Sequence, residues 1–80
     1  MTREQVYEKL NKIFREVFDD DDIILNDNTT ADDIEDWDSL EQINLVVACE
    51  KQFNIKFDMK EIQVLKNVGE MVDIILSKTE

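Results

Sequence analysis

The residues best suited to chemistry are Asp38, Ser39 and Leu40, which stand where an apolar helix is expected to begin. At a helix start, unpaired backbone amides and the positive end of the helix dipole converge, and both favour a phosphate bonded to the Ser39 oxygen. Serine and aspartate are also preferred capping residues, so Ser39 or Asp38 could simply cap the helix. The residue types therefore leave two roles open for Ser39, a phosphate attachment point or a cap.

The sequence contains few residues that could form another catalytic, redox or metal site. The chain has no histidine, which removes Ser/His and Cys/His nucleophile pairs and the commonest zinc ligand. Its single cysteine, Cys49, falls on the inward side of an expected helix, which predicts an inert thiol rather than a redox nucleophile. A calcium-binding EF-hand loop counted from Asp20 would put Ile24 at the fifth position and Leu25 where glycine must turn the chain. We therefore expect neither an enzyme nor a specific metal site.

Negative charge is concentrated in one stretch of the chain. Twenty acidic and nine basic residues give a net charge of −11, and residues 19–38 hold ten of the acids and no base. These acids are Asp19, Asp20, Asp21, Asp22, Asp27, Asp32, Asp33, Glu35, Asp36 and Asp38. Such a surface repels nucleic acid and attracts basic protein patches, although charge runs often do no more than solubilise a connection. We expect basic protein partners, no nucleic acid, and a monomer favoured by self-repulsion.

The elements that must position Ser39 are indicated by helix start signals. Four times a capping residue is followed three positions later by Glu or Gln, with apolar periodicity downstream. The pairs are Thr2 with Gln5, Asp38 with Glu41 (or, shifted by one, Ser39 with Gln42), Asp58 with Glu61, and Asn67 with Glu70. They predict helices over residues 3–18, 39–53, 58–65 and 67–78, with Ile62 and Leu65 facing the core. No stretch alternates as a strand does, so we expect an all-α fold in a single domain over residues 1–80.

A connection of about twenty residues separates the first two predicted helices, which is longer than bundle loops usually are. Its apolar residues, Ile23, Ile24, Leu25, Ile34 and Trp37, are expected to pin it to the core. With 80 residues and 42% hydrophobic content, the chain has enough apolar material for one small core only. No apolar run is long enough to span a membrane, so we expect a soluble, cytoplasmic protein without membrane insertion.

The predicted second helix is apolar over more than half of its circumference. Leu45, Val46, Cys49 and Phe53 gather on one side, and Leu40, Ile43 and Val47 form a second stripe about 120° away. A surface helix needs a stripe of only about 100°, so the second stripe is either buried in the bundle or exposed for a partner. Asp38, Glu41 and Glu50 flank this stripe as a polar rim, which favours docking.

The run Asp38-Ser39-Leu40 after a long acidic loop, in an acidic chain of this length and helix order, resembles the acyl carrier protein family. The resemblance covers essentially the whole chain, including the segment LEQINLVVACEKQF. It implies a four-helix bundle with a short third helix and a long loop between the first two helices. It also implies a carrier rather than an enzyme. Acyl groups would be held as thioesters on a 4'-phosphopantetheine arm, which a phosphopantetheinyl transferase transfers from coenzyme A to Ser39.

The resemblance further assigns roles to two sets of residues. The face offered to basic patches on acyl-loading and acyl-transferring enzymes comprises Asp38, Leu40, Glu41, Ile43, Val47 and Glu50. A space between helices that shelters an acyl chain is lined by Val46, Cys49, Phe57, Ile62, Leu65 and Met71. Each residue of this second set also fits an ordinary core position.

Several residues depart from carriers dedicated to fatty acid synthesis. Trp37 precedes the serine motif where a small residue is common, and Asn44 and Lys51 interrupt the acidic rim. The form Trp-Asp-Ser-Leu resembles discrete carriers of specialised pathways, such as polyketide, peptide or surface-saccharide modification. The sequence does not choose among these pathways. The rival interpretation is an unmodified acidic helical adaptor that uses the second helix only for protein contacts.

Overall fold

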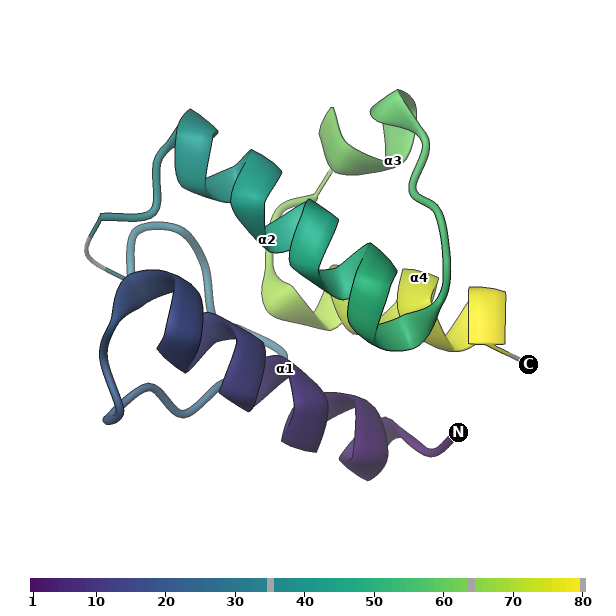
Figure 1. Ribbon diagram of the computed structural model, residues 1–80, viewed down its shortest axis with the longest axis horizontal. Coiled ribbons are helices and arrows are strands. Elements are labelled where there is room, and N and C mark those ends of the chain that lie inside the picture. The colour runs from purple at the N-terminus through teal and green to yellow at the C-terminus, as the bar shows by residue number, and fades with distance from the viewer. Residues whose placement is uncertain (35, 64, 80) are drawn as a thin grey trace.

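The computed structural model describes residues 1–34, 36–63 and 65–79, which form four helices and no strand. The helices are α1 (Arg3–Phe18), α2 (Ser39–Phe53), α3 (Met59–Gln63) and α4 (Val68–Thr79). α1 packs against both α2 and α4, whereas the short α3 lies on the far side of α2 from α1 (Figure 1). The connection 19–38 lies at the end of the bundle where α2 begins, and both termini lie at the other end (Figure 1). The prediction of an all-α bundle with a short third helix is confirmed.

Two of the predicted helices have the expected bounds and two differ. Residues 3–18 and 39–53 are helical as predicted, whereas α4 is shifted by one residue to Val68–Thr79. α3 is shorter than the predicted range 58–65, because it covers only Met59–Gln63 and Leu65 is not helical. Residue 64 of that predicted range lies outside the described part of the chain. Asp58 stands just before α3, where its backbone amide donates to Glu61 Oε1 at 2.8 Å.

The start of α1 shows the full predicted hydrogen-bond pattern. Gln5 N donates to Thr2 Oγ1 at 3.2 Å, and Thr2 N donates to Gln5 Oε1 at 2.9 Å. At the start of α4, Glu70 N donates to Asn67 Oδ1 at 2.9 Å. These bonds satisfy amides that a helix start leaves without a helical partner. None of the described helices has the length and apolar character needed to cross a membrane.

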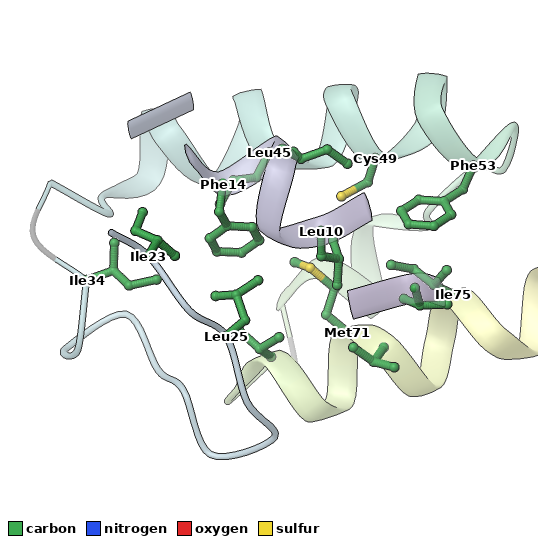
Figure 2. Packing of buried hydrophobic residues seen from close by; sticks show 14 residues of the cluster. Leu10, Phe14, Ile23, Leu25, Ile34, Leu45, Cys49, Phe53, Met71 and Ile75 are labelled. Atoms are coloured by element: carbon green, nitrogen blue, oxygen red, sulfur yellow. The ribbon is translucent and has the colours of Figure 1, made fainter. Parts of the chain in front are cut away.

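The core is built mainly from α1, α2 and α4 (Figure 2). Its fully buried side chains are Val6, Leu10 and Phe14 of α1, Leu45 and Cys49 of α2, and Val68, Met71, Val72 and Ile75 of α4. Burying each large apolar side chain contributes about 1.5–3 kcal/mol. α3 contains no buried residue, so the expectation that it turns Ile62 into the core is wrong: Ile62 is only half-buried. Leu65, which follows α3, does pack against the core.

The connection 19–38 is folded into the core. Ile23, Leu25 and Ile34 are buried and face Phe14 (Figure 2), whereas Ile24 is 76% exposed and does not pin the connection as expected. Two polar side chains of α1 hold this segment in place. Asn11 Oδ1 accepts from Leu25 N at 2.9 Å, and Arg15 Nε donates to Ile23 O at 2.9 Å.

The same connection is bonded to the start of α4. Val68 N donates to Thr29 O at 2.8 Å, and Gly69 N donates to Asp27 O at 3.1 Å. The carbonyls thus take the place of a capping side chain for amides of the first turn. A Cβ atom on Gly69 would lie 2.8 Å from Asp27 O, so this close approach of two backbones explains the glycine.

Candidate functional site

Asp38 caps α2, and Ser39 does not. Asp38 Oδ1 accepts from Glu41 N at 2.9 Å, and Asp38 O accepts from Gln42 N at 2.9 Å. The shifted alternative, in which Ser39 caps the helix through Gln42, is therefore wrong. Ser39 is the first helical residue, and its side chain is exposed. The fold leaves the Ser39 hydroxyl out of the cap.

The surroundings of Ser39 fit a covalently attached phosphate better than a free one. Within the described residues, no acceptor is bonded to the amides of Ser39 and Leu40, which open the first turn. Asp36 and Asp38 are exposed beside them, so a free anion would be repelled. No described side chain is hydrogen-bonded to the Ser39 hydroxyl. This oxygen is therefore open to a phosphate bonded covalently to it.

Trp37 and Gln42 form one side of this site. Trp37 Nε1 donates to Gln42 Oε1 at 2.6 Å, and its indole stands edge-on to Phe14 with ring centroids 5.3 Å apart. A surface hollow of about 370 Å³ is lined by Ala31, Trp37, Asp38, Ser39 and Gln42. Sequence reasoning missed Gln42 as a site residue. The sequence signal that could have found it was the spacing of Trp37 and Gln42, an indole donor and an amide acceptor five positions apart on either side of a helix start.

The second apolar stripe of α2 is exposed. Leu40, Ile43 and Val47 are 65%, 60% and 43% exposed, whereas Leu45, Val46, Cys49 and Phe53 on the other side are buried. Of the two alternatives that the sequence left open, exposure is therefore the correct one. A row of exposed apolar side chains on one helix is typical of an interaction surface.

The three acids of the polar rim are not equivalent. Asp38 is exposed and caps α2, and Glu41 Oε1 accepts from Asn44 Nδ2 at 3.2 Å. Glu50 Oε2 accepts from Phe57 N at 2.9 Å, so this carboxylate holds the connection between α2 and α3. A substitution of Glu50 would therefore disturb local structure as well as surface charge.

Two of the six residues predicted to shelter an acyl chain meet at a cavity. Leu65 and Met71 line a recess of about 50 Å³ together with Ala31, Trp37, Lys66 and Asn67. Of the other four, Val46 and Cys49 are buried, and Phe57 and Ile62 are half-buried.

Cys49 is packed against the core (Figure 2) and is fully buried. Burial raises the pKa of its thiol to about 12, and the nearby Glu50 carboxylate adds to the rise. The thiol stays protonated at neutral pH, which agrees with the predicted lack of reactivity. Across the described residues, no three His, Cys, Asp or Glu side chains come together as a group of metal ligands.

Comparisons with known proteins agree on one family. Residues 8–75 match the family model of the phosphopantetheine attachment site. The chain is 30% identical over 79 residues to the acyl carrier protein of Petrotoga mobilis, which covers 98% of this chain and 92% of the relative. It is also 30% identical over 78 residues to the acyl carrier protein of Coprothermobacter proteolyticus, covering 96% and 94%. The solution structure of a holo acyl carrier protein from Geobacter metallireducens has a TM-score of 0.85 to this chain, with 49% identity, covering 90% of this chain and 83% of that one. The resemblance carried by Asp38-Ser39-Leu40 is confirmed, and the chain belongs to the acyl carrier protein family, whose members are carriers and not enzymes.

Proposed function

We propose that Ser39 is the residue to which 4'-phosphopantetheine is attached, and that the protein carries acyl intermediates as thioesters on this group. The cofactor is attached covalently in this family, and its terminal thiol supplies the thioester chemistry. The observation that best supports Ser39 is its exposed side chain at the first position of α2, left free by the Asp38 cap. The unmodified adaptor remains the alternative, because the exposed stripe of α2 would serve it equally well.

Attachment requires a phosphopantetheinyl transferase, the partner that acts on this family. A bond forms between Ser39 Oγ and the coenzyme A phosphorus that bears the pantetheine, the phosphoanhydride bond at this phosphorus breaks, and adenosine 3',5'-bisphosphate leaves. A base on the transferase accepts the Ser39 proton, since no described residue of the chain is bonded to this hydroxyl. The contribution of the chain is an accessible oxygen at a fixed position.

The biosynthetic enzymes that load and unload the carrier are proposed to dock on the exposed stripe Leu40, Ile43 and Val47. Asp38, the last residue of the acidic connection 19–38, and Glu41 lie at the start of this stripe. Basic patches on the partners would be attracted to this end of α2, which makes association fast, weak and sensitive to salt.

The central test is mass spectrometry of the intact protein after incubation with coenzyme A and a broad-specificity phosphopantetheinyl transferase. We expect the mass to rise by one phosphopantetheine and the modified peptide to contain Ser39. An unchanged mass, with a transferase proven active on another carrier, would contradict the proposal and favour the unmodified adaptor.

Ser39→Ala separates attachment from stability. Because Asp38 is the cap, the substitution should change the free energy of unfolding by about 0.5 kcal/mol or less while loading vanishes. The matched control is Thr2→Ala, which breaks the capping box of α1 at a cost of about 1 kcal/mol and should load normally. Parallel loss of loading in both variants would point to stability as the cause.

Glu41→Lys tests the docking face, because its side chain bonds only Asn44 among the described residues. We expect slower loading at low salt, with the difference fading as salt is raised. Glu4→Lys makes the same charge change on an exposed residue in the first turn of α1, which lies at the other end of the bundle from the start of α2 (Figure 1), and it should load at the parent rate. Equal rates for all three proteins at low salt would mean that the face is wrongly placed.

For the pathway, we propose only a class of biosynthesis. The cargo is an acyl intermediate of fatty acid, polyketide or another specialised biosynthesis, and Trp37 before the serine motif favours a specialised one. The monomeric state, the cytoplasmic location and the single domain over residues 1–80 stay predictions. Sedimentation of the loaded protein tests the first of these.

A further inference from the structure

The surface hollow beside Ser39 shares two lining residues with a second, inner cavity. The outer hollow is the surface hollow of about 370 Å³ that Ser39 and Gln42 line, and the inner recess is the space of about 50 Å³ at Leu65 and Met71. Ala31 and Trp37 line both spaces. The indole is by far the larger of these two side chains. Trp37 is therefore the main partition between the surface next to Ser39 and the space beside the core.

The indole of Trp37 is held in position from two sides. On the inner side it stands edge-on to Phe14 at 5.3 Å, with Phe18 at 6.2 Å between ring centroids. On the outer side its Nε1 donates to Gln42 Oε1 at 2.6 Å. An indole with one apolar edge packed and its polar edge hydrogen-bonded has little freedom to turn. The partition is thus a fixed wall rather than a loosely placed side chain.

The volume of the inner recess limits what can enter it. An apolar cavity of about 150 Å³ accepts one benzene molecule, so a recess of about 50 Å³ has room for about two carbon atoms. Leu65 and Met71 give it an apolar lining on the side of the core, and Lys66 and Asn67 also line it. A short, uncharged acyl group fits this space, and a longer chain does not.

We propose that Trp37 determines the cargo size that this carrier shelters, by restricting the inner recess to a short acyl group such as acetyl. The inference rests on the proposed attachment at Ser39, from which a flexible arm can fold back over the outer hollow. Its end reaches the inner recess past the small, exposed Ala31, the other residue that lines both spaces. Longer acyl groups are carried too, but their thioesters stay in solvent.

The test compares the reactivity of two thioesters on the intact protein. The broad-specificity transferase loads the chain from acetyl-coenzyme A or octanoyl-coenzyme A, and hydroxylamine cleavage is timed against the same thioester on coenzyme A. Burial of about two carbons favours the sheltered form about tenfold, so the acetyl group should be cleaved about tenfold more slowly on the protein. The octanoyl group should be cleaved at the rate of octanoyl-coenzyme A.

Trp37→Ala should reverse which thioester is protected, because removing the indole enlarges the recess. The octanoyl thioester should become protected from hydroxylamine, and the acetyl thioester should lose most of its protection. The matched control is Phe18→Ala, which loosens the same aromatic cluster but lines neither cavity among the described residues. It should keep the parent's preference for acetyl. A reversal in both variants would mean that loosening, and not the partition, sets the preference, which overturns the inference.

Fluorescence of the parent provides a measurement that needs no variant, because Trp37 is the only tryptophan. Acetyl loading should shift its emission relative to the unacylated holo protein, and octanoyl loading should leave it unchanged. Equal protection of both thioesters, or equal emission shifts, overturns the inference while the attachment stands. A parent that gains no mass with an active transferase contradicts the attachment itself, so the two failures are distinguishable.

Discussion

The connection 19–38 and helix α3 differ in opposite ways from what their secondary structure would lead one to expect. The described residues of the connection form no helix, yet Ile23, Leu25 and Ile34 are buried in the core. α3 is helical, yet none of its residues is buried. Helical structure and burial are therefore separate properties in this chain. Apolar burial contributes most of the stability, so the irregular segment matters more to the fold than the regular one.

The two segments are also held by different kinds of contact. Backbone groups of the connection bond to Asn11, Arg15 and the start of α4. α3 itself is held by the ion pair of Glu61 and Lys78 at 3.0 Å. Its flanks are held by Glu50, which accepts from Phe57 N, and by the half-buried Phe57 and Leu65, which pack against the core. Segments with few buried apolar contacts open at lower free energy than the core. We therefore expect α3 to open locally while the connection unfolds with the whole protein.

The largest expected effect comes from Leu25→Ala in the connection. Removing a buried leucine side chain costs about 2–5 kcal/mol, a large share of the ~4–12 kcal/mol that a chain of this size holds. Ile62→Ala in α3 is the matched change, and its half-buried side chain should cost about 1 kcal/mol or less. Chemical denaturation followed by circular dichroism measures both. Equal losses would contradict the difference drawn between the two segments.

Gly69→Ala breaks the junction between the connection and α4. In an ordinary helix, alanine in place of glycine would be favourable by about 1 kcal/mol. Here the added Cβ would meet Asp27 O at 2.8 Å. The carbonyl is a backbone group and a Cβ is fixed in position by the backbone that bears it, so neither can turn away. We expect a loss of about 1–3 kcal/mol from overpacking. A higher midpoint of thermal unfolding than the parent's would show that the connection can move aside.

The sequence predicted the parts of the fold that depend on local signals. Capping residues and apolar periodicity placed α1 and α2 correctly, because both signals act within a few residues. The errors at Ile24 and Ile62 concern which apolar side chain is buried, and this depends on packing between segments far apart in sequence. The same holds for the candidate site. Ser39 was singled out by its place at a helix start together with the resemblance of Asp38-Ser39-Leu40 to the acyl carrier protein family. The bond of Glu50 to Phe57 N and the wall formed by Trp37 required the tertiary structure.

The pH dependence of stability should also reflect the connection. Tyr7 donates a hydrogen bond to Asp27, and a guanidinium nitrogen of Arg3 lies 2.7 Å from Asp27 Oδ1. Together these two contacts hold the pKa of Asp27 below its usual value. The lowered pKa stabilises the folded state at pH values above the pKa of an aspartate in the unfolded chain, about 3.9, and this stabilisation is lost as the pH falls below that value.

Asp27→Asn removes that titrating group. Its free energy of unfolding should therefore fall less steeply than the parent's below about pH 4. Tyr7→Phe removes the larger contributor but keeps Arg3, so its slope should be intermediate. Urea titrations at a series of pH values provide the slopes. Identical slopes for the parent and Asp27→Asn would mean that Asp27 is not coupled to folding.

The smallest expected effect concerns the ion pair that holds α3. Glu61 accepts from Asp58 N and pairs with Lys78, and these two contacts lower the pKa of its carboxyl group in that order of size. Glu61→Gln keeps an oxygen that can accept from Asp58 N but removes the charge, so it isolates the pair with Lys78. Global unfolding should be nearly unchanged, because pairs of this kind contribute little in contact with water. Hydrogen exchange at the amides of α3 should nevertheless quicken by about two- to fivefold, since local opening is what the pair opposes. Lys78→Met should give the same change by removing the other partner. If neither variant alters exchange in α3, the half-buried packing of Ile62, and not the ion pair, keeps the helix in place.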